Sequence, residues 1–291
     1  MTLWNSIFLG IIQGLAEFLP ISSSGHLAIF QEVFNIQGAS MTFDVMLHFG
    51  TLVAIFIAFW NDIKKLFVEG ISIVRDFFIN LYRFFVNLGK KKGQGIGYVE
   101  MVKTPYRKFV MLVIVSTIPT AVIGLLLDNV IEEVSSSLLI VGICLMVTAV
   151  LLFVADNCNV GNKRPKNIKY SEAGIVGVVQ GMAVLPGISR SGSTITACLL
   201  CGFDKSFAVK YSFIMSIPTV IGAVILELKD FSKLAVSGTE LTYYIVGTVV
   251  AAIVGYICIK TMLVLVRGKK FKGFSIYCLI AGLFSIIYYF V

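Results

Sequence analysis

The chain has 291 residues, of which 57% are hydrophobic and 14% are charged, and its mean hydropathy is +0.92. Soluble domains are about 45–50% apolar and about 25% charged, so the composition excludes a soluble enzyme and indicates an integral membrane protein. A net charge of +8 would suit a nucleic-acid-binding protein, but most of the basic residues cluster between apolar runs, at 61–108, 163–169 and 267–272. That distribution is the positive-inside pattern of membrane proteins. We therefore expect membrane lipids as partners and no nucleic acid.

The first apolar stretch is broken. Residues 3–19 stop at Pro20, and a second apolar piece, 26–36, follows a Ser-Ser-Ser-Gly turn at 22–25. Neither piece reaches the roughly 18 residues that cross a bilayer cleanly, so the pair predicts a re-entrant hairpin. Irregular backbone at membrane depth is tolerated only where it faces protein or a wet cavity. The hairpin is therefore a candidate binding site.

The remaining elements follow in chain order. A full span is expected at 43–60, and a long amphipathic connection at 61–107 has the pattern of a helix lying in the membrane interface, followed by a solvated loop at 89–95. Residues 172–201 predict a second broken hairpin. The other spans are expected at 109–127, 138–155, 206–226, 241–266 and 273–290, with the acidic loop 128–137 between the first two.

The positive-inside rule orients these elements. The basic loops go to the cytoplasm, and the loops 128–137 and 228–240 go outside. The first hairpin then starts and ends outside, and the second starts and ends inside. The expected fold is an all-α polytopic membrane protein with six transmembrane helices and two re-entrant hairpins, arranged as an inverted-topology repeat. It forms one membrane domain, 1–291, with repeat one at 1–155, including the connection 61–107, and repeat two at 172–291.

The two hairpins carry a duplicated motif. Sliding residues 13–25 forward along the chain matches Gln13 to Gln180 and Ser24-Gly25 to Ser191-Gly192. The first copy carries an acid and a histidine, whereas the second carries an arginine and a threonine. Copies that hold opposite charges predict one shared site, with both hairpin tips near the midplane of the membrane.

Arg190 is the charged residue in the second copy of the motif. An arginine at the centre of a membrane helix costs at least about 2.5–3.5 kcal/mol, so it must pair with an anion. Pro186-Gly187 breaks the preceding helix, and Ser189 is a suitable N-cap for the next one, whose free N–H groups favour an anion. Ser189, Arg190, Ser191 and Thr194 together have the composition of a phosphate cradle. The alternative is a structural arginine paired with a carboxylate.

The first copy supplies the groups that can react. Glu17 is the only acid in its apolar core, and Gln13 lies four residues earlier on the same helical face. Glu17 could be a general base, a divalent-metal ligand together with Gln13, or the partner of Arg190. His26 could be a nucleophile or a general acid. The further candidates for contact with substrate are the hydroxyls of Ser22, Ser23 and Ser24, and Gly25, which allows close backbone approach.

A second histidine, His48, lies near the outer end of span 43–60, four residues after Asp44. For both residues we expect a role in helix packing or at the interface. The acid, hydroxyls, histidine and arginine favour binding of an anionic lipid headgroup, most simply a phosphate or diphosphate. A transporter or lipid flippase is the rival, because inverted repeats are typical of transporters, but a carrier needs no nucleophile. A scaffolding protein would not explain the intramembrane charges.

Residues 13–26 also resemble the Glu/Gln-x-x-x-Glu motif and the following Ser-Ser-x-Gly-His of bacterial undecaprenyl-diphosphatases of the bacitracin-resistance type. Residues 186–194 resemble that family's Pro-Gly-x-Ser-Arg-Ser-x-x-Thr motif, and similarity continues at 43–51 and 213–218. The resemblance implies hydrolysis of undecaprenyl diphosphate to undecaprenyl phosphate and inorganic phosphate in the bacterial plasma membrane. This reaction recycles the lipid carrier for peptidoglycan synthesis and confers bacitracin resistance.

The resemblance also assigns residues. The family's functional positions fall on Glu17, Ser23, His26, Ser189, Arg190 and Thr194. Family members are thought to use Mg²⁺ or Ca²⁺, and here Gln13 stands where other members have Glu, so Glu17 and the Gln13 carbonyl are the ligands that this motif offers. We expect Glu17, Ser23, His26 and Arg190 to be catalytic and the other hydroxyls, Gln13 and Gly25 to contact the polyprenyl diphosphate. Whether the protein forms a homodimer is left open.

Overall fold

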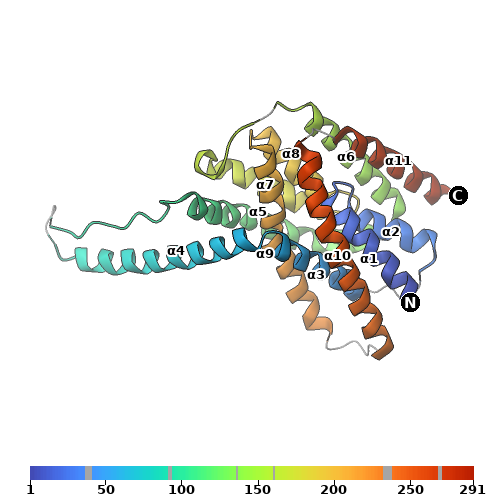
Figure 1. Cartoon of the computed structure of the whole chain (residues 1–291), viewed down its shortest axis with the longest axis horizontal. Coiled ribbons are helices and arrows are strands. Elements are labelled where there is room, and N and C mark those ends of the chain that lie inside the picture. Colours follow the sequence, from blue (N-terminus) through green and yellow to red (C-terminus); the bar gives the residue numbers. More distant parts are fainter. Residues whose placement is uncertain (37–40, 91–93, 136, 160, 232–237, 268–270) are drawn as a thin grey trace.

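The structure is a computed structural model of the whole chain, and it describes all residues except 37–40, 91–93, 136, 160, 232–237 and 268–270. Within the described ranges it has eleven α-helices, one short 3-10 turn and no strand (Figure 1). The helices are α1 (Leu3–Phe18), α2 (Ser23–Val33), α3 (Met41–Ala58), α4 (Trp60–Asn87), α5 (Pro105–Ser135), α6 (Leu138–Asn157), α7 (Tyr170–Met182), α8 (Arg190–Leu200), α9 (Lys205–Phe231), α10 (Gly238–Arg267) and α11 (Phe271–Phe290). The expected all-α class is confirmed.

Five helices are long and apolar enough to cross a membrane: α5, α6, α9, α10 and α11. The helices α3 and α4 pass the same test only as a pair, because they meet at a bend of 86°. The chain therefore has five membrane-span candidates, or six if this bent pair counts as one, against six expected. The chain is a multi-pass membrane protein.

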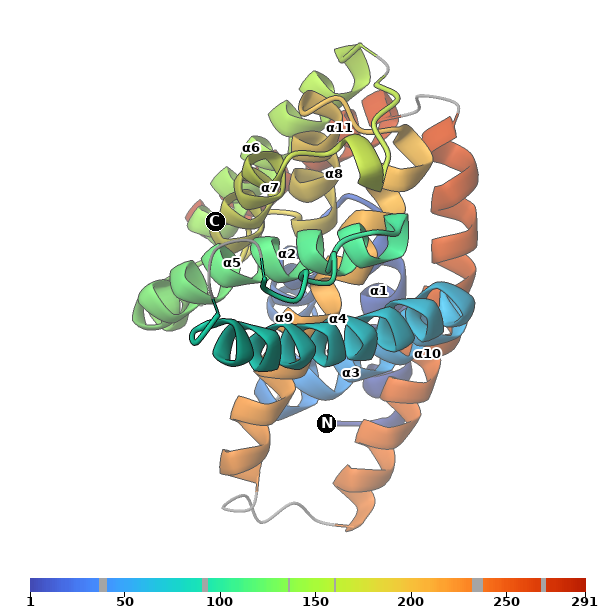
Figure 2. The ribbon, with the colours of Figure 1, turned by 90° about the vertical axis from the view of Figure 1, so that its left-hand side faces the viewer.

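The helix α4 is an arm attached to the body of the protein. It leaves the end of α3 and crosses the front of the bundle in Figure 2. Around the middle of α4, Arg107 of α5 forms ion pairs with Glu69 at 2.8 Å and Asp76 at 2.6 Å, which fix the arm to α5. The apolar side chains Phe67, Ile71, Val74, Phe78, Leu81 and Phe85 are exposed. A helix is thus confirmed over most of the connection 61–107, and its place in the membrane interface stays a prediction.

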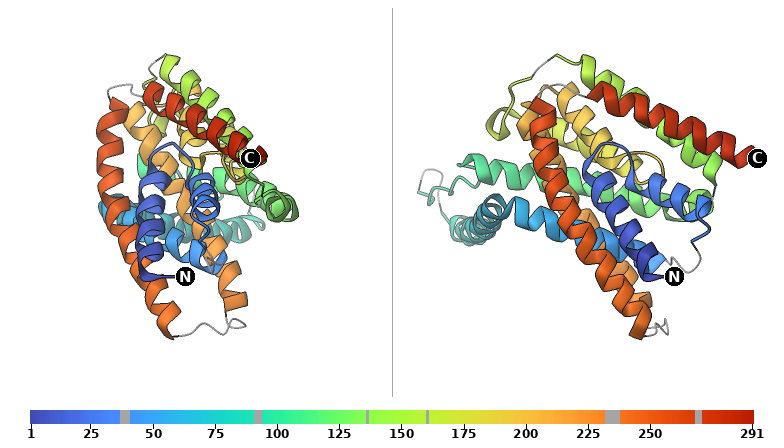
Figure 3. Two further views of the ribbon diagram at one scale, coloured as in Figure 1. Left: turned by 90° about the vertical axis from the view of Figure 1, so that its right-hand side faces the viewer. Right: turned by 45° about the vertical axis from the view of Figure 1, so that its right-hand side comes forward.

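Small residues allow close packing between helices that lie far apart in the sequence. A Cβ atom on Gly10 of α1 would lie 2.6 Å from the carbonyl oxygen of Gly247 in α10, and one on Gly142 of α6 would lie 2.8 Å from that of Gly282 in α11. Such small residues allow membrane helices to approach backbone to backbone. Figure 3 shows α1 beside α10 and α6 beside α11. The first helix therefore packs against one of the last.

Two pairs of short helices occupy the centre. The helices α1, α2, α7 and α8 have 16, 11, 13 and 11 residues, fewer than the roughly 20 of a spanning helix. Short connections join α1 to α2 and α7 to α8, so both predicted breaks are confirmed. The two connections meet, since a Cβ on Gly25 would lie 3.0 Å from the Cα of Gly187. That each pair enters and leaves the membrane on one side stays a prediction.

One expected loop is helical instead. The helix α5 continues to Ser135, through most of the loop predicted at 128–137. The side chains of Asp128, Glu132 and Glu133, together with 91–93 of the loop 89–95, 232–237 of the loop 228–240 and 268–270 of the basic cluster 267–272, lie outside the described part.

Candidate active site

A cavity of about 540 Å³ opens where the two hairpins meet α3 and α9. Its polar lining consists of Glu17, Ser22, Ser23, Ser24, Gln31, Asp44, His48, Gln180, Ser189, Arg190, Ser191 and Thr219. The other residues lining it are mostly apolar, among them Leu27, Val45, Val184 and Val220. The cavity therefore suits a ligand with a charged group and an apolar chain.

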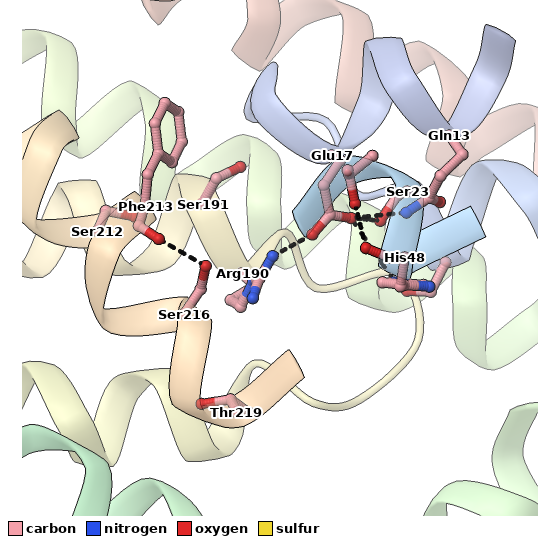
Figure 4. A network of polar contacts seen from close by, with 12 residues as sticks. Gln13, Glu17, Ser23, His48, Arg190, Ser191, Ser212, Phe213, Ser216 and Thr219 are labelled. Carbon is pink, nitrogen blue, oxygen red and sulfur yellow. Dashed lines mark hydrogen bonds and ion pairs between the residues drawn. The ribbon is translucent and has the colours of Figure 1, made fainter. Parts of the chain in front are cut away.

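Glu17 is the centre of the polar part. Its side chain is only 4% exposed, and it joins the two hairpins, because Oε1 accepts a hydrogen bond from the Arg190 guanidinium. The second oxygen, Oε2, accepts one from the Ser23 hydroxyl at 2.6 Å and one from Nε2 of Gln13 at 3.1 Å (Figure 4). The opposite charges of the duplicated motif thus meet in one ion pair.

The two motifs form the same local hydrogen bond. In α2 the Ser22 hydroxyl accepts the N–H of Gly25 at 3.3 Å, and in α8 the Ser189 hydroxyl accepts the N–H of Gly192 at 3.1 Å. Ser189 is therefore confirmed as an N-cap, and Ser22 is its counterpart. Both helices begin at the cavity, and helix N-termini with free N–H groups attract anions. Together with Arg190 they offer a binding place for a phosphate.

This geometry agrees with what the chain resembles. The sequence model of the family described as "Bacitracin resistance protein BacA" matches residues 6–284, nearly the whole chain. The chain belongs to the BacA family. A relative from Halothermothrix orenii named undecaprenyl-diphosphatase is 41% identical over 99% of this chain and 98% of its own length. Relatives with the same name from Methanosphaera stadtmanae and Desulforapulum autotrophicum are each 40% identical, over 97% and 100% of this chain and 96% and 100% of their own lengths.

The divalent cation expected from the family resemblance does not fit the side chains of this BacA-family chain as they are placed. Glu17 already holds Arg190, Ser23 and Gln13, so its charge is neutralised and Oε2 has two donors. Oε1 of Gln13 is buried without a hydrogen-bond partner, but Mg²⁺ and Ca²⁺ need several oxygen ligands, carboxylates among them. The described residues contain no group of three or more acidic, histidine or cysteine side chains that could hold a metal. The described side chains therefore offer a divalent cation too few free oxygen ligands.

His26 is placed away from the reaction space. It is 4% exposed and is not among the residues that line the cavity. Its Nδ1 lies 2.7 Å from the carbonyl oxygen of Ser22, which can only accept, so Nδ1 carries the proton. In the neutral ring Nε2 then accepts from the Tyr277 hydroxyl at 2.8 Å, and the two rings stack. Both nitrogens are occupied and the ring links α2 to α11, and the catalytic role expected of His26 stays a prediction.

Gln13 and Thr194 lie behind the cavity rather than in its wall. Both are completely buried and neither lines the cavity. Gln13 donates to Glu17, and the Thr194 hydroxyl donates to the backbone carbonyl of Arg190 at 2.8 Å and lies 2.5 Å from that of Ser212. They therefore support the two charged residues, and the expected contact with substrate does not follow from their positions.

Gly25 lies against the other hairpin. Its expected contact with substrate stays a prediction, and the nearest neighbour of its missing side chain in the structure is Gly187. Gly187 has a positive φ of 93° and its own Cβ would lie 2.4 Å from the carbonyl oxygen of Val141, so it cannot move aside easily. The two glycines let the hairpin tips touch.

Gly25→Ala should therefore destabilise the protein. The new Cβ would lie 3.0 Å from Gly187 and 3.2 Å from the capping Ser22 hydroxyl, and overpacking of this kind costs about 1–3 kcal/mol. We expect a lower midpoint of thermal unfolding in detergent. Gly174→Ala is the matched control, since nothing lies within 4 Å of the position of its Cβ. Equal midpoints for the two variants would contradict the contact.

The sequence analysis did not predict five polar residues that line the cavity: Gln31, Asp44, His48, Gln180 and Thr219. Two signals could have found some of them. Gln180 is the duplicate of Gln13, and Asp44 and His48 lie in the stretch 43–51 that resembles the family. Gln31 donates to Asp44 at 3.1 Å, which ties α2 to α3 at the cavity.

Proposed function

We propose that the chain is an integral membrane phosphatase that hydrolyses undecaprenyl diphosphate to undecaprenyl phosphate and inorganic phosphate. One observation carries the proposal: the Ser23 hydroxyl donates at 2.6 Å to Glu17, whose other oxygen accepts from Arg190. In this proposal Ser23 is the nucleophile, Glu17 is its base and Arg190 binds the phosphate, and all three residues line one cavity. The substrate is taken from the name of the relatives, undecaprenyl-diphosphatase. In the bacterial plasma membrane this reaction would return the lipid carrier to peptidoglycan synthesis and confer bacitracin resistance.

The reaction would begin with an exchange of partners. The terminal phosphate takes the Arg190 guanidinium from Glu17, and the hydroxyls of Ser189 and Ser191 and the N–H groups at the start of α8 complete its binding. Guanidinium and phosphate form strong charge-assisted hydrogen bonds, which lower the energy of the charge that develops in the transition state. Glu17, released from Arg190, is then free to act as a base.

The transfer itself uses Ser23. Its Oγ forms a bond to the terminal phosphorus while its proton moves to Glu17, and the bond from phosphorus to the bridging oxygen breaks. Undecaprenyl phosphate leaves with the electron pair, and Glu17 gives its proton to the oxygen that leaves. Water then attacks the phosphoserine while Glu17 takes a proton from it. The bond between phosphorus and Oγ breaks, and Ser23 recovers a proton from Glu17. The apolar wall of the cavity leads the prenyl chain into the bilayer.

We also propose that the chain is a single membrane domain built as two inverted repeats with re-entrant hairpins. The packing supports this arrangement, since α1 packs against α10 and α7 packs against α5, as expected if α1 corresponds to α7 and α5 to α10. The matching Ser22 and Ser189 caps support it as well.

The direct test is phosphate release from undecaprenyl diphosphate by purified protein in detergent, with and without Mg²⁺ or Ca²⁺. We expect turnover by the wild type and a loss on the order of 10²–10⁴-fold in Glu17→Ala, the usual contribution of a general base. A folded wild type that releases no phosphate under any of these conditions would sink the proposal. A lipid flippase would then be the better hypothesis, and the translocation of lipid across liposome membranes would be measured.

A further inference from the structure

The chain contains two histidines, and the structure places them differently. His26 is enclosed between α2 and α11, as described above. His48 of α3 lines the cavity, and its side chain is 32% exposed. A phosphate that enters the cavity can therefore reach the ring of His48 without displacing a helix, whereas the ring of His26 is not part of the cavity wall.

A backbone contact orients the ring of His48. Its Nδ1 lies 2.8 Å from the carbonyl oxygen of Asp44, one turn earlier in α3. Because a carbonyl oxygen only accepts, Nδ1 must carry a proton, and Nε2 is the nitrogen that remains for the cavity. It lies 3.7 Å from Oε2 of Glu17. Figure 4 shows His48 and Arg190 approaching Glu17 from different sides.

The charges of the cavity leave a place for a second cation. The ionisable side chains among its described lining are Glu17, Asp44, His48 and Arg190. Arg190 is the one permanent cation in that set, and Glu17 already neutralises it. A diphosphate adds further negative charge, and phosphate oxygens are bound best by charged donors. A protonated His48 donates from Nδ1 to the Asp44 carbonyl and still has Nε2–H to offer.

We propose that His48 is a second phosphate-binding residue of this site, whose Nε2–H donates to a phosphoryl oxygen on the side away from Arg190. The phosphate is then held by donors from both halves of the chain, with its phosphorus facing Ser23. His48 also stays close enough to Glu17 to neutralise part of its charge after Arg190 has moved to the substrate. This inference rests on the proposed phosphatase function and adds a substrate contact to it.

The test compares three substitutions in the phosphate-release assay, with undecaprenyl diphosphate as substrate. His48→Leu keeps the bulk and removes the donor, and we expect kcat/KM to fall roughly 10- to 100-fold, the usual effect of losing a hydrogen bond to a charged group. His48→Gln can still place an N–H near the same point, so we expect it to recover most of the loss. His48→Ala leaves space in an open cavity, so added imidazole should restore part of its activity.

The matched control is His26→Ala with the same imidazole series. That ring fills an enclosed site against Tyr277, so we expect a lower thermal midpoint and no rescue. The proposal is overturned if His48→Leu works within about threefold of the wild type, if His48→Gln is as poor as His48→Leu, or if imidazole rescues His26→Ala but not His48→Ala. Absence of phosphate release by the wild type would instead contradict the proposed function itself.

Discussion

Arg190→Ala is expected to lower kcat/KM for undecaprenyl diphosphate on the order of 10³-fold, the range seen when a charged group that stabilises a phosphoryl transition state is removed. The reason is that Arg190 is the permanent cation of the cavity and lies at the capped start of α8, where a phosphate would bind. Phosphate release by purified protein measures the effect.

The control for this prediction is Arg190→Lys, which keeps the charge but loses the planar pair of donors. It should fall between the wild type and Arg190→Ala. Because Arg190→Ala also leaves Glu17 buried without its ion-pair partner, thermal unfolding must be recorded alongside to separate lost chemistry from lost folding. A folded Arg190→Ala protein within tenfold of wild-type turnover would contradict the role of Arg190.

Ser23→Ala should cost at least about 10³-fold in kcat with little change in KM, since removing the nucleophile of a covalent mechanism has an effect of this size or larger. The hydroxyl makes the hydrogen bond of 2.6 Å to Glu17, and no other described serine contacts that carboxylate. Single-turnover measurements with substrate labelled at the terminal phosphate would also show label on the wild-type protein and none on the variant.

The neighbouring hydroxyl provides the comparison. Ser24 also lines the cavity, but its Oγ contacts the Ser22 hydroxyl at 3.4 Å rather than Glu17. Ser24→Ala should therefore lose only about tenfold or less, as for one hydrogen bond to substrate. If Ser23→Ala and Ser24→Ala are equally impaired, or if Ser23→Ala still becomes labelled, Ser23 is not the nucleophile.

Local sequence patterns predict most of the helices. The lengths of the apolar runs and the Pro and Gly breaks predict helix ends close to those observed, such as 3–19 for α1 and 138–155 for α6. The duplicated motif with opposite charges predicts the meeting of Glu17 and Arg190 across 173 residues. These features depend on local chemistry, or on the rule that an intramembrane charge needs a partner, so they can be read without coordinates.

The surroundings of the two histidine rings could not be predicted from local sequence patterns. His26 follows a hydroxyl cluster and attracts attention in the sequence, but its partner Tyr277 lies 251 residues away, and only tertiary packing brings that ring to it. His48 lies in an apolar helix whose rotation about its axis decides between the cavity and the lipid. The end of α3 near residue 60 was predicted, but the bend of 86° between α3 and α4 and the extension of α5 to Ser135 were not.

The close packing of α1 against α10 sets the order of events during synthesis. Ser6 of α1 donates to the carbonyl of Tyr243, which is 237 residues further along the chain, and translation at about 5–20 residues per second needs roughly 10–50 seconds to reach it. For most of that interval, until residue 190 is made, the first hairpin is present and Glu17 lacks Arg190. Of the contacts of Glu17, those with Gln13 and Ser23 can form within the first hairpin, whereas its charge is paired with Arg190 only after the second hairpin is made.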